Sequence, residues 1–251
     1  MKLGFSERAR REAFIPTPFL GTLLNPVYIA RSALYRCVAS VAPEISGSVL
    51  DFGCGSKPYE FLFKNATEYV GLDTKAGHDH EALGSKVDVF YDGKVIPFEA
   101  GRFDAVVSFE VMEHVFNIDE ALEEIKRVLK PGGTVLITMP FLWFEHEQPY
   151  DFGRYTSYGI KSVLLRHGFS NPKVQKTTSF FLALCQLNIA YLAYFLFPTS
   201  PLARRALQVL VIFPVTVVSV ALDRIIPKRD ECFCASLVTA TKAGDNDRTP
   251  N

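Results

Sequence analysis

Short apolar runs divide the first two thirds of the chain, and most of them end close to an acidic residue or a glycine. Runs of this length without polar interruption are typical of strands buried on both faces of a parallel sheet. Segments with apolar residues at helical spacing lie between them, and this alternation predicts an α/β fold. The expected strands are 49–52, 68–73, 86–92, 103–109, 135–139 and 173–178, and the expected helices include 59–64, 117–130 and 156–167.

The N-terminal part is expected to add one helix to this core. Residues 1–24 are basic and interrupted by prolines, which predicts an irregular arm. Asn25 and Pro26 then form a typical helix start, and apolar residues continue at helical spacing as far as Pro43. The helix is interpreted as packing on the sheet edge, with a lid over the ligand site as the alternative.

Two stretches without any charged residue, 180–197 and 206–222, set the C-terminal third apart. They contain 18 and 17 residues, at the lower limit for a helix that crosses about 30 Å of hydrocarbon. A strand-like pattern resumes only at 231–241, so 179–226 is interpreted as an apolar helical insertion ahead of the last strand. The tail 243–251 is polar and is expected to be disordered.

Composition removes several classes of function. The 251 residues suffice for one domain with additions. Equal numbers of basic and acidic residues, 27 each, give no electrostatic case for a nucleic-acid partner. The five cysteines form no C-x-x-C pair, so neither a disulfide framework nor a zinc site is expected. The segment His78-Asp79-His80-Glu81 is interpreted as a solvated loop, so no metal is expected, and no signal peptide is expected at the basic N-terminus.

A glycine turn follows the first expected strand, in the order Asp51, Gly53, Cys54 and Gly55. Such a strand–turn segment presents backbone N–H groups to a nucleotide-like ligand. The third glycine of the dinucleotide fingerprint is replaced by Pro58, which weakens a pyrophosphate interpretation. A carboxylate at Asp51 would repel phosphate, but it can organise the turn and attract an ammonium group. S-adenosylmethionine carries an ammonium, a ribose and an adenine, so it is the expected ligand.

Five motifs occur in order: LDFGCGSKPY, VDVFYDG, FEVMEHV, LKPGG and EHEQPYDFGRYT. In these motifs the chain resembles class I S-adenosylmethionine-dependent methyltransferases of the type 11 group, in a branch that includes methyltransferases encoded with bacterial surface-polysaccharide genes. The resemblance covers residues 25–178 and the last strand. It implies a Rossmann-like fold with a mostly parallel seven-stranded sheet, an antiparallel last strand and helices on both faces.

The resemblance also implies a set of cofactor-binding residues. Asp73 lies 18 residues beyond Gly55, where an acid at the end of the second strand can accept both ribose hydroxyls. Asp92 and Gly93 match the position that meets the adenine, and Phe109 and Glu110 match the position that faces the methionine part, where an aromatic face suits a sulfonium. His114 is expected to hold its loop rather than to take part in catalysis. Asp51, Gly53, Cys54 and Gly55 complete the expected cofactor site.

The segment 141–155 is expected to choose the acceptor, because it is dense in aromatic and hydrogen-bonding groups and begins where a strand leaves the sheet. Such a mixture suits a sugar, and a packed surface loop is the alternative. His146 is the candidate general base because its ordinary pKa lies near neutrality, with Asp151 in reserve. The expected substrate-binding residues are Trp143, Glu145, Glu147, Arg154 and Tyr155.

Together these features predict methyl transfer to a small-molecule acceptor, expected to be a hydroxyl of a lipid-linked or envelope sugar. The alternatives are a quinone or membrane-lipid methyltransferase and a non-catalytic, membrane-docked protein that binds the cofactor. The insertion is expected to dock on the cytoplasmic side of the inner membrane as a peripheral or monotopic element. The alternative is that its two helices bury against the domain or form a homodimer interface. The expected parts are an N-terminal arm and helix at 1–45, the core at 46–178, the insertion at 179–226, the last strand at 227–242 and the tail at 243–251.

Overall fold

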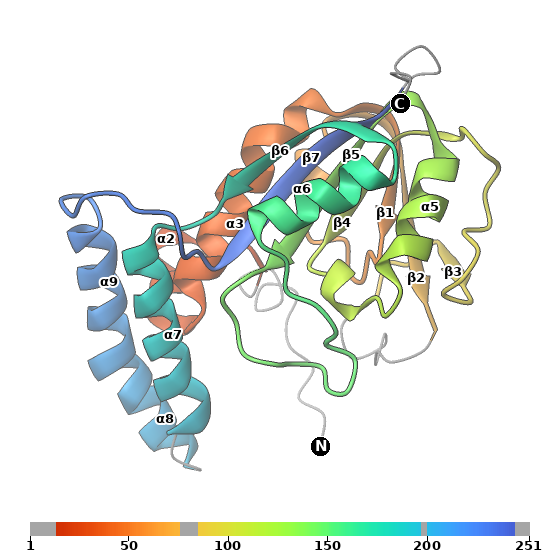
Figure 1. The fold of residues 1–251 in the computed structure, drawn as a ribbon. Coiled ribbons are helices and arrows are strands. Elements are labelled where there is room, and N and C mark those ends of the chain that lie inside the picture. The colour runs from red at the N-terminus through yellow and green to blue at the C-terminus, as the bar shows by residue number, and fades with distance from the viewer. Residues whose placement is uncertain (1–13, 76–84, 197–199, 244–251) are drawn as a thin grey trace. The chain divides into compact units, whose positions relative to one another are not determined.

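The structure is a computed structural model that describes residues 14–75, 85–196 and 200–243 (Figure 1). The chain forms two compact units. The first contains residues 1–37, 141–143 and 176–235, and the second contains residues 38–140, 144–175 and 236–251. The expected loop at 78–81 and the expected tail lie outside the described residues, apart from Ala243.

A seven-stranded sheet organises the second unit, in the order β3-β2-β1-β4-β5-β7-β6. The pairs joining β3, β2, β1, β4 and β5 are all parallel. The last strand β7 runs antiparallel to its neighbour β6, because Ser170 bonds to Thr241 at one end and Thr177 bonds to Ala235 at the other. The predicted fold is therefore confirmed. The strands are β1 (Ser46–Phe52), β2 (Asn65–Thr74), β3 (Val89–Tyr91), β4 (Phe103–Phe109), β5 (Leu129–Pro140), β6 (Phe169–Lys176) and β7 (Ala235–Lys242).

The main apolar core lies between one face of this sheet and the helices α5 (Ile118–Val128) and α6 (Ser157–Arg166). Side chains alternate between the faces of a strand, so Leu50 and Phe52 of β1 enter this core while Asp51 points to the other face. The threonine at the N-cap of α6, Thr156, accepts a hydrogen bond from the N–H of Gly159, as a helix start requires. The core thus fixes β1, β4 and β5 in register, and their carboxyl ends lie along one edge.

Some expected elements differ in length from those observed. The helix expected at 59–64 is a single 3₁₀ turn, Glu60–Leu62. Because β2 already begins at Asn65, the residues after the glycine turn leave room for no more than this. The third strand is shorter than expected, since only Val89–Tyr91 pairs with β2. The expected irregular arm contains a short helix, α2 (Pro18–Leu24), whose proline stands in the first turn, where it is tolerated.

The first unit is helical. Helix α3 (Tyr28–Val41) begins in it, as the N-terminal pattern predicted. Helix α7 (Phe180–Phe195) packs against α9 (Phe213–Leu222), which is joined to α8 (Pro201–Leu207) by the π-helical segment Gln208–Ile212. The stretch Pro201–Leu222 is, within the described residues, the one helix whose length and apolar composition would allow it to cross a membrane.

Candidate active site

The glycine turn after β1 lies close to β2 and to the loop after β4. The N–H of Gly53 donates to the carbonyl of Leu72 at 2.8 Å, and its φ of +73° favours glycine. A Cβ at this position would lie 2.5 Å from the methyl groups of Val111. Gly55 also has a positive φ, of +48°, but a Cβ there would meet nothing within 4 Å. The turn is therefore tightly supported at Gly53 and open at Gly55, where a ligand can approach the backbone.

Lys57 is buried next to this turn. No role was predicted for it from the sequence. Lys57 is 7% exposed and forms an ion pair with Asp88. The same carboxylate accepts the N–H of Gly71 at 2.7 Å. A Cβ on Gly71 would lie 2.4 Å from Cε of Lys57 and 2.6 Å from the Cys54 sulfur. Gly71, in the middle of β2, thus leaves the space through which the Lys57 side chain reaches Asp88. This packing joins two separate segments, so no single motif shows it.

Asp51 is enclosed in the second unit, with only 1% of its surface exposed. Its Oδ2 accepts the hydroxyl of Tyr69 at 2.8 Å, while its Oδ1 has no hydrogen-bond partner among the described residues. Burial raises the pKa of Asp51 to about 7, although the bond from Tyr69 and the charge of Lys57 oppose this shift. The unpaired oxygen is a position where a cationic ligand group would be stabilised.

The strand-end acid Asp73 is buried and faces the glycine turn. Its Oδ2 accepts the N–H of Gly55 at 2.9 Å, and its Oδ1 accepts the N–H of Thr74 at 2.8 Å. Each carboxylate oxygen keeps a further lone pair for a ligand hydroxyl. The structure therefore brings Asp51, Gly55 and Asp73 to one edge of the sheet, as the sequence predicted, and their roles in cofactor binding stay predictions.

The remaining expected cofactor residues surround the same strand ends. Asp92 is exposed, and its Oδ1 accepts the N–H groups of Lys94 and Val95 at 2.9 and 3.2 Å, which lowers its pKa and forms a tight turn with Gly93 (φ +83°). Phe109 packs edge-on against Tyr59, with ring centroids 4.8 Å apart.

Glu110 directly follows β4 and has an unusual backbone conformation. Its φ is +56°, which is uncommon for a residue with a side chain. Its N–H is shared between the carbonyl and the hydroxyl of Thr138, both at 3.1 Å. The sulfur of the buried Cys54 contacts the carbonyl of Gly55, and burial raises the pKa of that thiol. Glu110 thus turns the chain sharply away from the sheet at the edge where Asp51 and Asp73 lie.

The two candidate bases of the acceptor segment are held together by an arginine. Asp151 binds Arg154 through both oxygens, and it also accepts the backbone N–H of His146 at 3.0 Å. Burial works against ionisation of Asp151, but these bonds outweigh it and lower its pKa to about 2. Burial and the charge of His114 lower the pKa of His146. A neutral imidazole therefore lies beside a carboxylate that is poorly suited to accept a proton.

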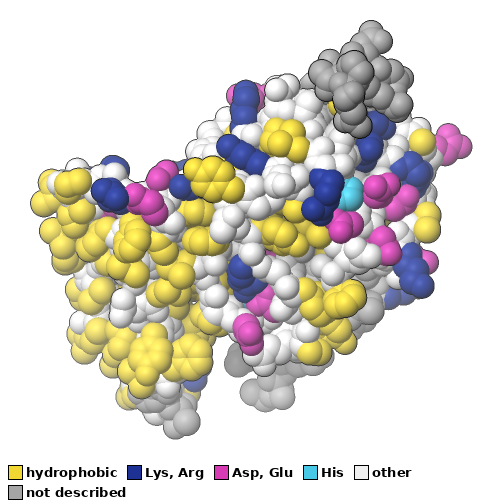
Figure 2. All heavy atoms as spheres, viewed as in Figure 1, with side chains coloured by type: hydrophobic (Ala, Val, Ile, Leu, Met, Phe, Trp, Pro, Cys, Tyr) yellow, Lys and Arg dark blue, Asp and Glu magenta, His cyan; other side chains and the backbone are white. Residues whose placement is uncertain are grey.

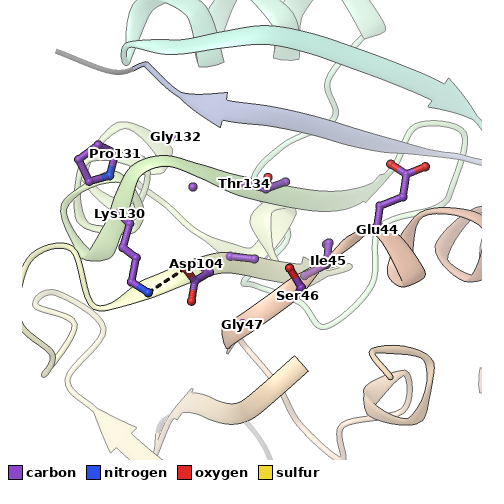
Figure 3. Close-up of a pocket in the computed structure, with 11 residues that line it drawn as sticks. Glu44, Ile45, Ser46, Gly47, Asp104, Lys130, Pro131, Gly132 and Thr134 are labelled. Carbon is purple, nitrogen blue, oxygen red and sulfur yellow. Dashed lines mark hydrogen bonds and ion pairs between the residues drawn. The ribbon is translucent and has the colours of Figure 1, made fainter. Parts of the chain in front are cut away.

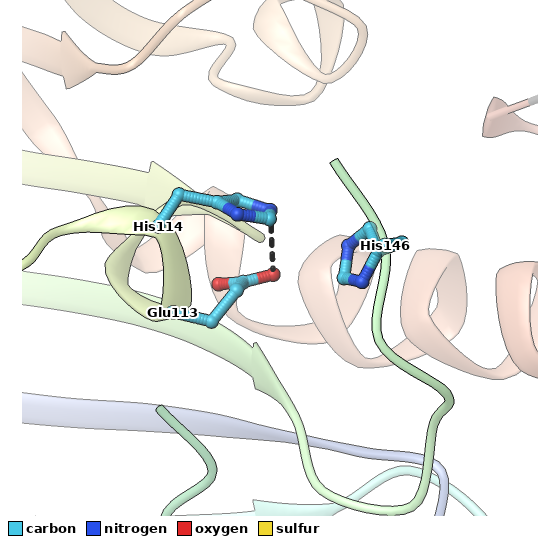
Figure 4. Close-up of side chains that lie close together, drawn as sticks. All are labelled: Glu113, His114 and His146. Atoms are coloured by element: carbon cyan, nitrogen blue, oxygen red, sulfur yellow. Dashed lines mark ion pairs between the residues drawn. The ribbon is translucent and has the colours of Figure 1, made fainter. Parts of the chain in front are cut away.

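The structure joins this segment to residues that the sequence did not connect with it. The carbonyl of Glu113 accepts the N–H groups of Phe152 and Gly153, at 2.7 and 3.2 Å. The rings of His114 and His146 lie 4.8 Å apart (Figure 4). Because 32 positions separate these histidines in the sequence, no local pattern could have predicted the contact.

The expected substrate-binding residues differ in their surroundings. Glu145 and Glu147 are exposed, whereas Tyr155 is partly buried and packs against the main core. Arg154 is committed to the ion pair with Asp151. Trp143 belongs to the first unit, while the residues that follow it belong to the second. Roles in acceptor binding stay predictions for all five.

A surface hollow near the beginnings of β1 and β4 lies at the opposite edge of the sheet (Figure 3). Its lining includes Asp104, which bonds to Lys130 at 2.7 Å and to the N–H of Ser48 at 2.8 Å. The bond from Lys130 is the main cause that lowers the pKa of Asp104 to about 2. Ligands of open α/β sheets bind beyond the carboxyl ends of the strands, so these residues are interpreted as bracing the amino ends.

Comparison with known families finds one match, to part of the core. Residues 50–137 match the family model described as a methyltransferase domain. This region, about a third of the chain, resembles a methyltransferase domain of the type 11 group. The matched region contains Asp51, the glycine turn, Asp73 and Glu110, which lie at the edge described above.

The relatives differ in how much of the chain they match. The mitochondrial ubiquinone biosynthesis O-methyltransferase of Homo sapiens is 32% identical over 108 residues, which are 38% of this chain and 29% of that protein. An uncharacterized methyltransferase of Mycolicibacterium gilvum is 28% identical over 183 residues, covering 68% of this chain and 70% of that one. The chain thus spans about a third of the length of the ubiquinone enzymes that it matches.

Solved structures of low identity share the fold. A Haemonchus contortus phosphoethanolamine N-methyltransferase 2 in complex with S-adenosyl-L-methionine superposes with a TM-score of 0.54 at 18% identity, covering 95% of this chain and 60% of that one. The [4+2]-cyclase SpnF gives the same TM-score at 17% identity, covering 89% and 93%. Because a cyclase has the same fold, the fold alone does not define the reaction.

Proposed function

We propose that this protein binds S-adenosylmethionine and transfers its methyl group to a small-molecule acceptor. The observation that carries the proposal is the convergence of Asp51, the open Gly55 and Asp73 at the carboxyl edge of a methyltransferase domain. These residues fit the cofactor: the unpaired Oδ1 of Asp51 suits its ammonium, and the free lone pairs of Asp73 suit its ribose. When bound, the cofactor supplies an activated methyl group on a sulfonium.

The contribution of the protein to such a reaction is mainly alignment. A donor that is already activated needs the acceptor oxygen, the methyl carbon and the sulfur in line, and alignment can contribute roughly 7–11 kcal/mol. The backbone turn at Glu110 and the buried side chains below it keep this edge in place. Burial and the charge of His114 lower the pKa of His146, which favours its neutral form, and its Nδ1 lies 3.1 Å from Oδ2 of Asp151. In that form His146 can accept the hydroxyl proton of an acceptor. A base of this kind contributes about 10²–10⁴-fold.

The acceptor class is a hydroxyl of a lipid-linked or envelope sugar. The motif order and the aromatic, hydrogen-bonding character of segment 144–155 support this choice, since sugars offer apolar C–H faces and a hydroxyl rim. Matched relatives named ubiquinone biosynthesis O-methyltransferase favour a second acceptor class, a quinone or another membrane lipid. Both classes place the acceptor at a membrane.

The test is to incubate the protein with cofactor labelled in the methyl group and with fractionated bacterial envelope extract, and then to identify the labelled product. A labelled glycan supports the first class, and a labelled quinone replaces it with the second. An Asp73→Ala variant is the control for label that does not depend on the cofactor site. If calorimetry shows cofactor binding but no fraction becomes labelled, the protein is a non-catalytic cofactor-binding protein.

Helices α7 to α9 of the first unit bury polar side chains and expose apolar ones. This arrangement supports docking on a membrane, which we propose is the cytoplasmic face of the inner membrane. Gln186 is fully buried, donating to the carbonyl of Pro26 at 2.9 Å and accepting the N–H of Ala30 at 3.0 Å. Gln208 and Thr216 are also buried. The exposed side chains of α7 to α9 are mostly apolar (Figure 2); they include Leu184, Tyr191, Tyr194, Phe195, Leu210, Val215, Val217, Val218 and Leu222. Polar groups inside and apolar groups outside are typical of a surface that faces lipid.

The charges at the ends of these helices favour shallow docking over a full crossing. A hairpin that crossed the bilayer would carry Arg204 and Arg205 to the far side, against the positive-inside tendency. Lys228 and Arg229 follow α9 at the base and are exposed, in ion pairs with Asp223 and Glu231. A basic residue contributes about 1 kcal/mol toward anionic headgroups, and here the headgroups would compete with these carboxylates.

Flotation on vesicles with anionic lipids tests this docking. The intact protein should float, and a Leu210→Glu, Val218→Glu variant should stay at the bottom, since both residues are exposed in the apolar surface. Phe116→Glu is the matched control, because Phe116 is 84% exposed in the other unit. An intact protein that stays soluble without vesicles and does not float contradicts docking, and a concentration-dependent dimer under those conditions assigns the apolar surface to a second copy instead.

A further inference from the structure

Three side chains that can bind metal converge where the loop after β4 meets the acceptor segment. Within the described part of the chain, one ligand atom from each of Glu113, His114 and His146 lies within 4.8 Å of the others. Figure 4 shows the Glu113 carboxylate pointing toward the two imidazole rings. The short 3₁₀ turn Met112–His114 supplies the first two side chains, and the segment beyond β5 supplies the third.

The carboxylate of Glu113 is buried without the partners that a buried charge requires. Its side chain is 0% exposed, and neither of its oxygens accepts a hydrogen bond from a described residue. The Nε2 of His114 lies 3.7 Å from Oε1 of Glu113, beyond hydrogen-bonding distance. Burial of an unpaired carboxylate is costly, and buried charges are normally paired or coordinate a metal. The carboxylate therefore indicates a ligand between it and the rings.

His114 is oriented so that its Nε2 carries the free lone pair. The Nδ1 of His114 lies 2.8 Å from the carbonyl of Tyr150, which can only accept, so this nitrogen is the donor. The Nδ1 of His146 is hydrogen-bonded to the guanidinium of Arg154 at 3.5 Å and lies 3.1 Å from Oδ2 of Asp151, so the tautomer of His146 determines which of its ring nitrogens carries the lone pair. A histidine that binds metal commonly donates its other ring N–H to a carbonyl or carboxylate, as His114 does.

We infer that Glu113, His114 and His146 bind a divalent transition-metal ion of the Zn²⁺ type. Two imidazoles and one carboxylate are the donor set of several catalytic zinc sites, which keep the fourth position open for water or substrate. Bonds of about 2.0–2.1 Å would draw the three ligand atoms closer than they are here. Such a closure needs side-chain movement of His146, which is 28% exposed and borders solvent.

This site changes the role of one residue of the proposed reaction. An imidazole whose lone pair binds a metal ion does not accept a proton from the acceptor, so His146 would be a ligand rather than a general base. The metal site itself does not depend on methyl transfer. A chain that binds the metal and transfers no methyl group would therefore leave this inference intact while it contradicts the proposed function.

Titration with Co²⁺ tests the site, because Co²⁺ replaces Zn²⁺ and gives a visible absorption that depends on its coordination. The full chain is treated with a chelator, dialysed and titrated. One equivalent of Co²⁺ should produce a saturable visible band, and Zn²⁺ should remove that band by competition. His114→Ala and His146→Ala should each abolish it, and the nearly isosteric Glu113→Gln should weaken binding by at least about ten-fold.

Two controls separate this site from other histidines. His167 also lies beside carboxylates, 2.7 Å from Asp119 and 3.4 Å from Glu123, so His167→Ala should leave the titration unchanged. A His78→Ala, His80→Ala variant should also bind normally. Circular dichroism confirms that each variant is folded. The inference is overturned if the intact protein gives no band, if the band survives both His114→Ala and His146→Ala, or if only the His78, His80 variant loses it.

Discussion

Replacing Asp51 by asparagine should change how the stability of the protein depends on pH. The carboxyl group is enclosed, and its pKa rises from 3.8 to about 7 in the folded chain. The folded state therefore holds a proton that the unfolded state has already lost. This contribution to stability is complete below the unfolded pKa and disappears as pH rises through 7. A rise of that size corresponds to about 4 kcal/mol in all.

The part of this range that can be measured conveniently lies between pH 5 and pH 8. Over it, the wild-type contribution of Asp51 should fall by about 2–3 kcal/mol. The asparagine side chain of the variant does not titrate, and its carbonyl can still accept the hydroxyl of Tyr69, as Oδ2 of Asp51 does at 2.8 Å. The free energy of unfolding of Asp51→Asn should therefore increase relative to wild type as pH rises.

Urea unfolding followed by circular dichroism at several pH values measures this difference. Asp92→Asn is the matched control: Asp92 is exposed and its pKa is lowered by backbone N–H groups, so it should not titrate between pH 5 and 8. If the difference between Asp51→Asn and wild type stays constant over this range, burial does not raise the pKa of Asp51, and the account of this carboxylate is wrong.

Three further predictions concern the same edge. Gly71→Ala should lower the free energy of unfolding by about 1–3 kcal/mol, because its Cβ would meet Lys57 and Cys54; an unchanged urea midpoint would contradict the close packing. Asp73→Ala should weaken cofactor binding by about 2–4 kcal/mol through the loss of charge-assisted bonds, and calorimetry that finds the same affinity would exclude the ribose role. If His146 is the general base, His146→Gln should lower turnover about 10²-fold with cofactor affinity near that of the wild type; full turnover of the variant would contradict the base role.

The sequence by itself determined the fold. Uncharged runs such as 105–109 are too short to be anything but strands when helical segments lie between them, and they become the buried strands of a parallel sheet. Asp51 and Asp73 could be placed for the same reason: each stands at or near the end of such a run, and parallel strands end at one edge.

Local patterns were less reliable where neighbouring segments competed for residues. The helix expected at 59–64 was reduced to one 3₁₀ turn because β2 extends back to Asn65 along β1. The third strand was shortened because only Val89–Tyr91 finds backbone partners on β2. The ends of both elements are set by pairing with another strand, which the residues of one segment do not specify.

Only the tertiary structure decided which side chains meet across the sheet edge. Lys57 reaches Asp88 past the bare backbone of Gly71, and Glu113 faces His146 from a loop more than thirty positions away. The hydrophobic pattern indicates whether a position is buried, but it does not indicate which polar residue from a distant segment lies next to it. For this protein, that distinction separates the placement of Asp51 and Asp73 at one sheet edge, which could be predicted from the sequence, from a histidine–carboxylate cluster, which could not.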